Sequence, residues 1–183
     1  MRRLLSALCA LLFSFPAVGC HRVSERAVPE VICGTPINPQ VTRSLLSSVN
    51  DLHEFNRVVR TDAITAPCIL LAGRDPVLEF RFSWDDSQTD LMYLAAGSGS
   101  VSNVTSPRSI TAPYKTVIGT DGAISTTPCK TKGGEYFTLT LQLPQIKLTD
   151  GTHRKDIEKF MRAYFPATVR TLGCERTNPV PPT

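Results

Sequence analysis

Two segments in which apolar and polar side chains alternate constrain the fold of this chain more than any other feature of its sequence. Leu78, Phe80, Phe82 and Trp84 alternate with polar residues, and residues 136–143 alternate in the same way. Successive side chains of a β-strand point to opposite faces of a sheet. Each segment therefore predicts a strand with one face in the core and the other face in contact with water.

Further strands accompany these two. Residues 68–72 form a short apolar run between Pro67 and Gly73, which is typical of a buried strand. Residues 114–118 and 123–127 flank a Gly-Thr-Asp-Gly sequence. Asp-Gly suits turns that need positive φ, so these two segments predict a hairpin.

Two helices enclose the predicted strands. Asn38 followed by Pro39 is typical of an N-cap and a first helical residue, and predicts a helix to about residue 48. Asp150 predicts the cap of a second helix, and Pro166 predicts its end. Helical spacing gives each helix one apolar face: Val41, Leu45, Leu46 and Val49 in the first, and Ile157, Phe160, Met161, Tyr164 and Phe165 in the second.

Two more segments complete the expected order of elements. Residues 86–96 fit either a short helix or a strand, and the sequence leaves this open. Residues 168–172 predict a last strand. Because the strands cluster between two helices, the predicted fold class is α+β: a mainly antiparallel sheet with two flanking amphipathic helices, stapled by disulfides.

The N-terminus has the composition of an export signal. Arg2 and Arg3 precede an apolar run at residues 4–15, and small residues follow it. The run is shorter than the roughly 20 residues that a membrane-spanning helix needs. Residues 1–19 are therefore predicted to be a signal peptide that is removed, rather than a stable membrane span or a buried helix.

The end of this signal predicts a lipid anchor. Ala17-Val18-Gly19-Cys20 resembles the lipobox of bacterial lipoproteins, with Ala17 where Leu is usual. The resemblance implies that the thiol of Cys20 receives a diacylglyceryl group and that cleavage leaves Cys20 as the first residue. Palmitate-type acyl chains would then hold the protein at the extracytoplasmic face of the cell membrane. A general signal peptidase could also cleave here, so a freely secreted protein is the alternative.

The number of cysteines favours lipidation. Cys9 is lost with the signal, which leaves five of the six cysteines: Cys20, Cys33, Cys68, Cys129 and Cys174. An odd number in an oxidising compartment leaves one reactive thiol, and lipidation of Cys20 removes the odd member.

The other four cysteines are predicted to form structural disulfides. Four cysteines allow three pairings, which the sequence does not decide. We favour Cys33–Cys68 and Cys129–Cys174, because each pair joins segments expected to meet at one end of the sheet. A zinc site is disfavoured, since the sequence has no C-x-x-C pair and no histidine at ligand spacing; no cofactor or metal is expected.

The expected domain organisation follows from these features. Residues 20–32 are the lipidated cysteine and a short tether, residues 33–174 form a single domain, and residues 175–183 form a proline-rich exposed end. The hydrophobic content of 42% and the net charge of +4 exclude a disordered chain. Lys and Arg are scattered among Asp and Glu, which argues against a nucleic-acid partner.

The sequence contains few residues with catalytic potential. His53 and His153 are expected on the surface, and no G-x-S-x-G nucleophile motif is present. Asp85, Asp86 and Asp90 form an acidic cluster that could do acid–base chemistry or bind an ion, but such loops are usually only solvated.

Other polar features are expected to be plain surface. The Gly-Ser-Gly-Ser loop at residues 97–100 lacks the lysine of a phosphate loop, and the sequon at Asn103 carries little weight beside a lipobox. The last helix carries a basic face that Asp156 and Glu158 dilute. Its basic residues are His153, Arg154, Lys155, Lys159 and Arg162.

Four features of this sequence together resemble those of a known group of proteins. They are the lipobox-like Cys20, the Cys33-Gly-Thr sequence, a cysteine before an apolar strand and a cysteine after an amphipathic helix. They are similar to small actinobacterial cell-envelope lipoproteins of uncharacterised function. The resemblance implies a location and brings no catalytic residues. We therefore expect a non-enzymatic binding or accessory module, with an envelope protein or cell-wall component as a possible partner. The alternative is an envelope hydrolase that uses His53 or the acidic cluster.

Overall fold

The computed structural model describes residues 28–46, 51–97, 104–146 and 150–174. The predicted signal peptide, Cys20, most of the tether and residues 175–183 lie outside this part of the chain. None of the helices within the described ranges is both long enough and apolar enough to cross a membrane.

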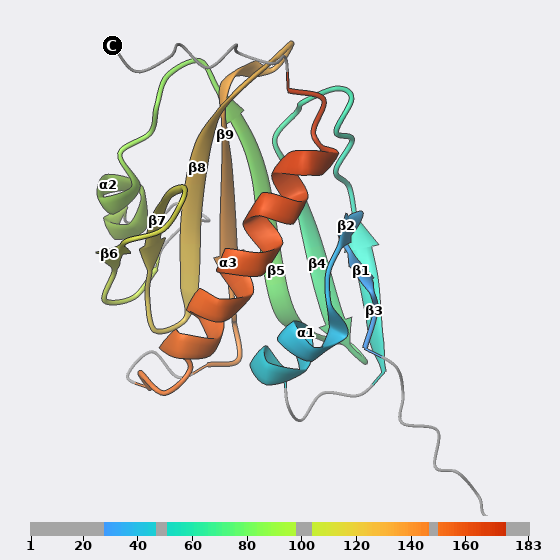
Figure 1. Cartoon of the computed structure of the whole chain (residues 1–183). Coiled ribbons are helices and arrows are strands. Elements are labelled where there is room, and N and C mark those ends of the chain that lie inside the picture. The colour runs from blue at the N-terminus through green and yellow to red at the C-terminus, as the bar shows by residue number, and fades with distance from the viewer. Residues whose placement is uncertain (1–27, 47–50, 98–103, 147–149, 175–183) are drawn as a thin grey trace, which may run out of the picture.

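An antiparallel sheet of seven strands forms the centre of the fold, and Figure 1 shows it with the helices on its faces. The strand order is β3-β4-β5-β9-β8-β7-β6. The strands are β3 (Leu52–Asn56), β4 (Ala66–Ala72), β5 (Asp75–Asp85), β6 (Arg108–Ile110), β7 (Lys115–Ile118), β8 (Gly122–Thr131) and β9 (Gly134–Gln142). A short hairpin of β1 (Val31–Ile32) and β2 (Thr35–Pro36) precedes the sheet. The helices are α1 (Pro39–Leu45), α2 (Leu91–Ala96) and α3 (Arg154–Thr171). The predicted α+β class with a mainly antiparallel sheet is confirmed.

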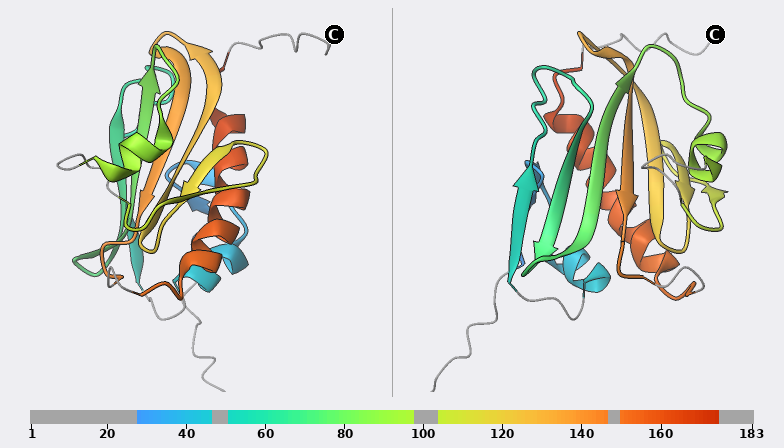
Figure 2. Two further views of the ribbon diagram at one scale, coloured as in Figure 1. Left: turned by 90° about the vertical axis from the view of Figure 1, so that its left-hand side faces the viewer. Right: turned by 180° about the vertical axis from the view of Figure 1, so that it is seen from behind.

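The core lies between the sheet and α3. Alternate residues of β5 point into it, and the four apolar side chains predicted from the alternation are all buried. Phe80 contacts the Tyr164 ring of α3 with 4.9 Å between ring centroids, and Phe137 of β9 stacks on Phe165 at 5.9 Å. Figure 2 shows α3 and α1 on one side of the sheet and α2 on the other.

The expected end of the last helix at Pro166 is wrong, and so is the strand expected at residues 168–172. Helix α3 continues through Pro166 to Thr171. Proline removes one backbone donor from the helix, but the turn that follows buries Ala167 and Thr168. The hydroxyl of Thr168 also donates to the carbonyl of Tyr164 at 3.0 Å. Burial of this turn therefore outweighs the local effect of the proline.

The sequence predicts the N-cap of the first helix correctly and the N-cap of the second helix incorrectly. Asn38 caps α1, where its side-chain oxygen accepts from the backbone N–H of Gln40 at 2.9 Å. This helix ends at Leu45, earlier than expected, and Val49 lies outside the described residues. The predicted cap of the second helix is wrong, because Asp150 accepts from the backbone N–H of Thr152 in the turn before α3.

The second face of the sheet is covered over β7 and β8. Residues 86–96, which fit either helix or strand, contain α2. A second apolar cluster packs beneath this helix, and its buried members are Leu91, Ala95, Val104, Val117 and Ile124.

The sequence predicts that one face of strand β9 is in contact with water, and this prediction is wrong for the middle of the strand. Thr138 and Thr140 are buried on the face opposite α3. In the register of the sheet Thr140 lies between the longer side chains of Arg81 and Ile124, which cover it.

Two disulfides tie the two ends of the described domain to the sheet, and they form the pairing favoured from the sequence. Cys33 in the β1–β2 turn is bonded to Cys68 of β4, and Cys129 of β8 is bonded to Cys174 after α3. The partners are separated by 35 and 45 residues. In the chain-entropy account, closing each loop restricts the unfolded chain enough to contribute about 4 kcal/mol of stability.

Candidate functional site

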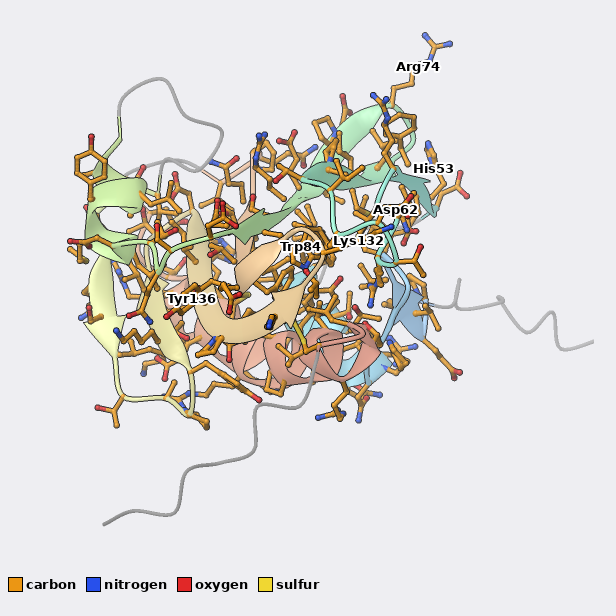
Figure 3. All side chains as sticks on the ribbon, turned by 90° about the horizontal axis from the view of Figure 1, so that it is seen from above. His53, Asp62, Arg74, Trp84, Lys132 and Tyr136 are labelled. Atoms are coloured by element: carbon orange, nitrogen blue, oxygen red, sulfur yellow. A yellow bond between two sulfur atoms is a disulfide. The ribbon has the colours of Figure 1, made fainter. Side chains whose placement is uncertain are left out.

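The residues that the sequence offered for catalysis lie apart. His53 is exposed on the edge strand β3, whereas Asp85 lies at the end of β5, a central strand, opposite Tyr136 of β9. Figure 3, which looks down on one end of the sheet, shows the separation of His53 from Tyr136. Asp90 is the N-cap of α2, where its Oδ1 accepts from the backbone N–H groups of Met92 and Tyr93. The structure thus gives Asp90 a structural role and does not bring His53 to the acidic cluster.

Partial burial perturbs one member of that cluster. Desolvation raises the pKa of Asp85 above the usual carboxyl range, and the negative charge of the neighbouring Asp86 raises it further. Such a carboxyl group holds its proton more tightly than a solvated one. No described hydrogen bond or ion pair joins it to a nucleophile or a histidine.

The basic face expected on the last helix is partly used by the fold itself. Arg154 donates to the carbonyl oxygens of Ser106 and Ile118, at 3.1 and 2.9 Å. Arg162 donates to the carbonyl of Thr111 at 2.7 Å and pairs with Glu158. These two arginines hold the loops around β6 against α3, which supports the interpretation of this face as structural surface.

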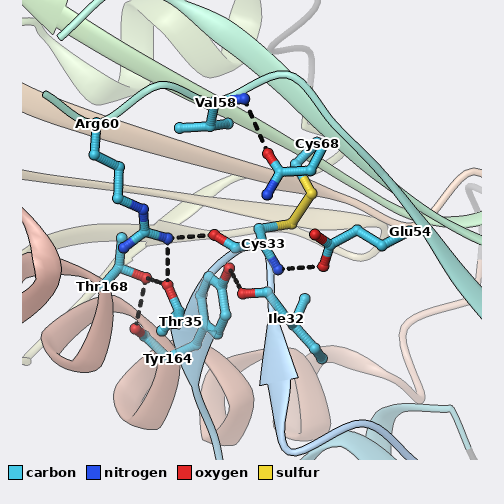
Figure 4. The surroundings of a disulfide bond; sticks show 10 residues. Ile32, Cys33, Thr35, Glu54, Val58, Arg60, Cys68, Tyr164 and Thr168 are labelled. Atoms are coloured by element: carbon cyan, nitrogen blue, oxygen red, sulfur yellow. Dashed lines mark hydrogen bonds between the residues drawn. A yellow bond between two sulfur atoms is a disulfide. The ribbon is translucent and has the colours of Figure 1, made fainter. Parts of the chain in front are cut away.

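A polar cluster surrounds the first disulfide (Figure 4). Glu54 of β3 accepts from the backbone N–H of Cys33, and Arg60 donates to the carbonyl of Cys33 and to the hydroxyl of Thr35. The sulfur atoms of Cys33 and Cys68 and a carboxylate oxygen of Glu54 lie within 4.8 Å of one another. Both sulfurs are in the disulfide, so this group offers no thiolate ligands for a metal.

The same cluster extends to α3. The hydroxyl of Tyr164 donates to the carbonyl of Ile32 at 3.0 Å, and the hydroxyls of Thr35 and Thr168 are also 3.0 Å apart. Burial raises the pKa of Tyr164, which keeps the hydroxyl protonated as a donor. The guanidinium of Arg60 lies 5.4 Å from the centre of the Phe82 ring. Burial lowers the pKa of Arg60 below its usual value. This cluster fastens the N-terminal hairpin to the core.

Hollows on the sheet face opposite α3 are the features that the sequence reasoning missed. A cleft of about 470 Å³ lies between α2 and strands β6 and β7. Its main cation is Lys115, which donates to the side chain of Gln88 at 2.8 Å. The amine and the capping carboxylate of Asp90 therefore already have partners within the protein.

Two further hollows share Pro67 of β4. A groove of about 240 Å³ lies over β4, β5 and β9 and contains Arg81, and a hollow of about 300 Å³ beside it contains Arg57. Arg81 lies directly opposite Pro67 in the β4–β5 register. On the other side the backbone N–H of Arg57 donates to the carbonyl of Pro67 at 3.2 Å, which continues the β3–β4 register by one residue. Arg57, Pro67 and Arg81 thus form one row across three strands.

Comparisons of this chain with protein-family models, with curated proteins and with solved structures find no match.

The row carries positive charge beside an apolar surface. Neither Arg57 nor Arg81 makes a side-chain hydrogen bond or ion pair with any residue that the structure describes. The next row along the strands contains Phe55, Ile69 and Glu79 in direct register. Phe55 is 51% exposed. The arrangement can bind an anionic group next to an apolar one.

Proposed function

We propose that this chain is a lipid-anchored lipoprotein of the cell envelope whose domain is a non-enzymatic binding module. The observation that carries the binding role is the sheet face opposite α3. None of the described helices covers this face over β3, β4 and β5, and hollows of about 240 and 300 Å³ lie there. Grouped exposed apolar residues mark interaction surfaces, and Phe55, Val59 and Ile64 are all exposed at or beside these hollows.

Cysteine usage supports the anchor. The four cysteines of the described domain pair with one another, and Cys9 lies in the predicted signal, so the two disulfides do not use Cys20. Disulfides persist in oxidising compartments, which agrees with export. An acylated Cys20 in a lipobox-like sequence accounts for the odd thiol, and two or three acyl chains give firm attachment where one gives only marginal binding.

Intact mass spectrometry of the exported protein tests this proposal. We expect a chain that begins at Cys20 with the added mass of acyl groups, and a gain of four hydrogens on reduction for two disulfides. The Cys20→Ser variant should lose the acyl mass and leave the membrane-anchored pool, whereas Cys9→Ser should keep both. An unmodified N-terminal Cys20 on a chain found in the medium would instead support free secretion and overturn the anchor.

The hydrolase alternative is weaker, because the residues it needs are dispersed. His53 is on an edge strand and Asp90 caps α2. Hydrolysis of envelope ester or glycosidic substrates that is lost in Asp85→Asn, with the fold retained, would favour the enzyme over the binding module.

A further inference from the structure

The strand register places two arginines where they can act on one ligand group. Arg57 and Arg81 lie on either side of Pro67, on strands two positions apart. Neighbouring strands are about 4.8 Å apart, so the two Cα atoms are separated by roughly 10 Å. An arginine side chain spans more than half of this distance, and the short ring of Pro67 between them leaves space above it. Both guanidinium groups can therefore approach a single phosphate, which arginine binds in a bidentate manner.

The charged side chains that line the two hollows are Arg57, Asp62, Glu79 and Arg81. Outside the hollows, Arg74 in the turn at the opposite end of β4 from Pro67 and Asp85 at the end of β5 add one charge of each sign. Asp62 lines the hollow of Arg57, but it is paired with Lys132 at 2.9 Å. Glu79 is the acidic residue in register beside the row. With Asp62 neutralised by Lys132, the two arginines outnumber Glu79 in the hollows, which therefore favour an anionic group over a cationic one.

Apolar side chains adjoin the arginines. Phe55 lies directly opposite Ile69 of β4, and Val59 and Ile64 around the hollow are 51% and 64% exposed. An interface between charged headgroups and hydrocarbon presents the same two chemistries side by side, and side chains of this kind bind there.

The predicted anchor brings the face within reach of such an interface. The described chain begins at Val28, close to β1, and β1 lies beside β3, where Glu54 accepts from Cys33. The residues between Cys20 and Val28 span at most about 29 Å when fully extended. The hairpin packs on the α3 side of the sheet edge that carries Phe55 and Arg57. The tether therefore reaches the uncovered face by passing around this edge.

We propose that the uncovered face of β3, β4 and β5 docks on anionic lipid of the membrane to which Cys20 is anchored. Arg57 and Arg81 bind a headgroup phosphate, and Phe55 and Ile69 contact the boundary with the acyl chains. This inference rests on the proposed function, because the lipid anchor supplies the proximity. The docked domain lies with the sheet against the membrane and with α3 facing away from it.

Vesicle co-sedimentation of an unacylated protein tests docking separately from anchoring. The protein is the mature chain, residues 20–183 with Cys20→Ser, exported through an unrelated cleavable signal and verified to contain both disulfides. We expect it to bind vesicles that contain phosphatidylglycerol, to bind pure phosphatidylcholine vesicles much more weakly, and to dissociate as salt is raised. The double variant Arg57→Gln/Arg81→Gln should lower the partition coefficient roughly 30-fold, and Phe55→Ser should lower it roughly fivefold.

The matched control is Arg170→Gln, which removes the same charge from an exposed position on α3. The docking face is refuted if Arg170→Gln lowers the partition coefficient as much as the single variants Arg57→Gln or Arg81→Gln do. It is also refuted if the protein binds phosphatidylcholine vesicles as well as it binds vesicles that contain phosphatidylglycerol. Full competition by millimolar glycerol phosphate at constant ionic strength would assign the arginines to a free phosphate ligand and reject the membrane. If mass spectrometry finds Cys20 acylated in the exported protein but the unacylated protein does not bind vesicles, docking is refuted and the anchor stands. If the unacylated protein binds vesicles but Cys20 of the exported protein is unmodified, the anchor is refuted and docking stands.

Discussion

The hydroxyl of Tyr164 should be worth a measurable part of the stability of this protein. Tyr164 and Ile32 are both fully buried, and the hydroxyl donates to the Ile32 carbonyl at 3.0 Å. Tyr164→Phe keeps the ring contacts with Phe80 and Phe160, at 4.9 and 5.1 Å between centroids. It removes the hydroxyl, and with it the bond to Ile32 and the side-chain hydrogen bonds with Thr35 and Thr168. A net hydrogen bond contributes about 1 kcal/mol, and a buried carbonyl left short of a partner adds to the loss.

We therefore expect the free energy of unfolding to fall by about 1–2 kcal/mol. For a domain of this size each kcal/mol corresponds to about 2–4 °C in Tm. Urea unfolding of the oxidised protein, followed by circular dichroism, measures the change, and the slope with urea should stay constant because the surface exposed on unfolding is the same. Reduction is avoided, since it would change the unfolded state as well.

Tyr93→Phe is the matched control, because Tyr93 is 80% exposed on α2 and its hydroxyl lies in water. This variant should unfold like the unaltered protein. A loss below about 0.5 kcal/mol in Tyr164→Phe, or an equal loss in both variants, would refute the claim that this bond fastens the N-terminal hairpin to α3.

Two further perturbations test the structure. Pro166→Ala restores a backbone donor within α3, and we expect a gain on the order of 1–2 kcal/mol in urea unfolding; a loss would show that ring packing outweighs the missing hydrogen bond. Because desolvation raises the pKa of Asp85, its ionised form destabilises the folded state. Asp85→Asn should therefore raise Tm at pH 7, and the gain should disappear as the pH falls and Asp85 becomes protonated. Asp86→Asn, which removes the smaller cause, should give a smaller gain; a gain in Asp85→Asn that persists at low pH would contradict the electrostatic explanation.

The parts of the fold that the sequence predicted are those set by local pattern. Alternation in β5 is a property of consecutive residues, and a strand with buried Phe80 and Phe82 is its direct consequence. The hairpin around Asp121 and the N-cap at Asn38 are likewise local. The disulfide pairing followed once the order of strands brought the right segments together.

The errors arose where tertiary packing overrides a local rule. Pro166 is a helix breaker in isolation, yet the turn after it is buried against the sheet and remains helical. Thr138 and Thr140 looked like solvent-facing residues of a strand, but the neighbouring strands cover them. Neither outcome can be predicted without knowledge of which surfaces meet.

The arginine row was invisible for a related reason. Arg57 and Arg81 are distant in sequence, and only the pairing of three strands places them on either side of Pro67. A shift of one residue in either register would move one arginine to the opposite face of the sheet. A search of the sequence for clustered charge could not find such a site.

Pro67 connects the proposed docking face to the stability of the N-terminal hairpin. In an antiparallel pair the N–H and C=O of one residue point toward the same neighbour. Since the carbonyl of Pro67 accepts from Arg57, its nitrogen also faces β3 and has no hydrogen to donate. The β3–β4 ladder therefore ends here, and the chain is free to turn after Arg57 and carry Arg60 to the carbonyl of Cys33 on the side of α3. On the face opposite α3, the short side chain of Pro67 thus leaves space between Arg57 and Arg81. On the α3 side, the end of the ladder at Pro67 lets the chain turn, so that Arg60 reaches the carbonyl of Cys33.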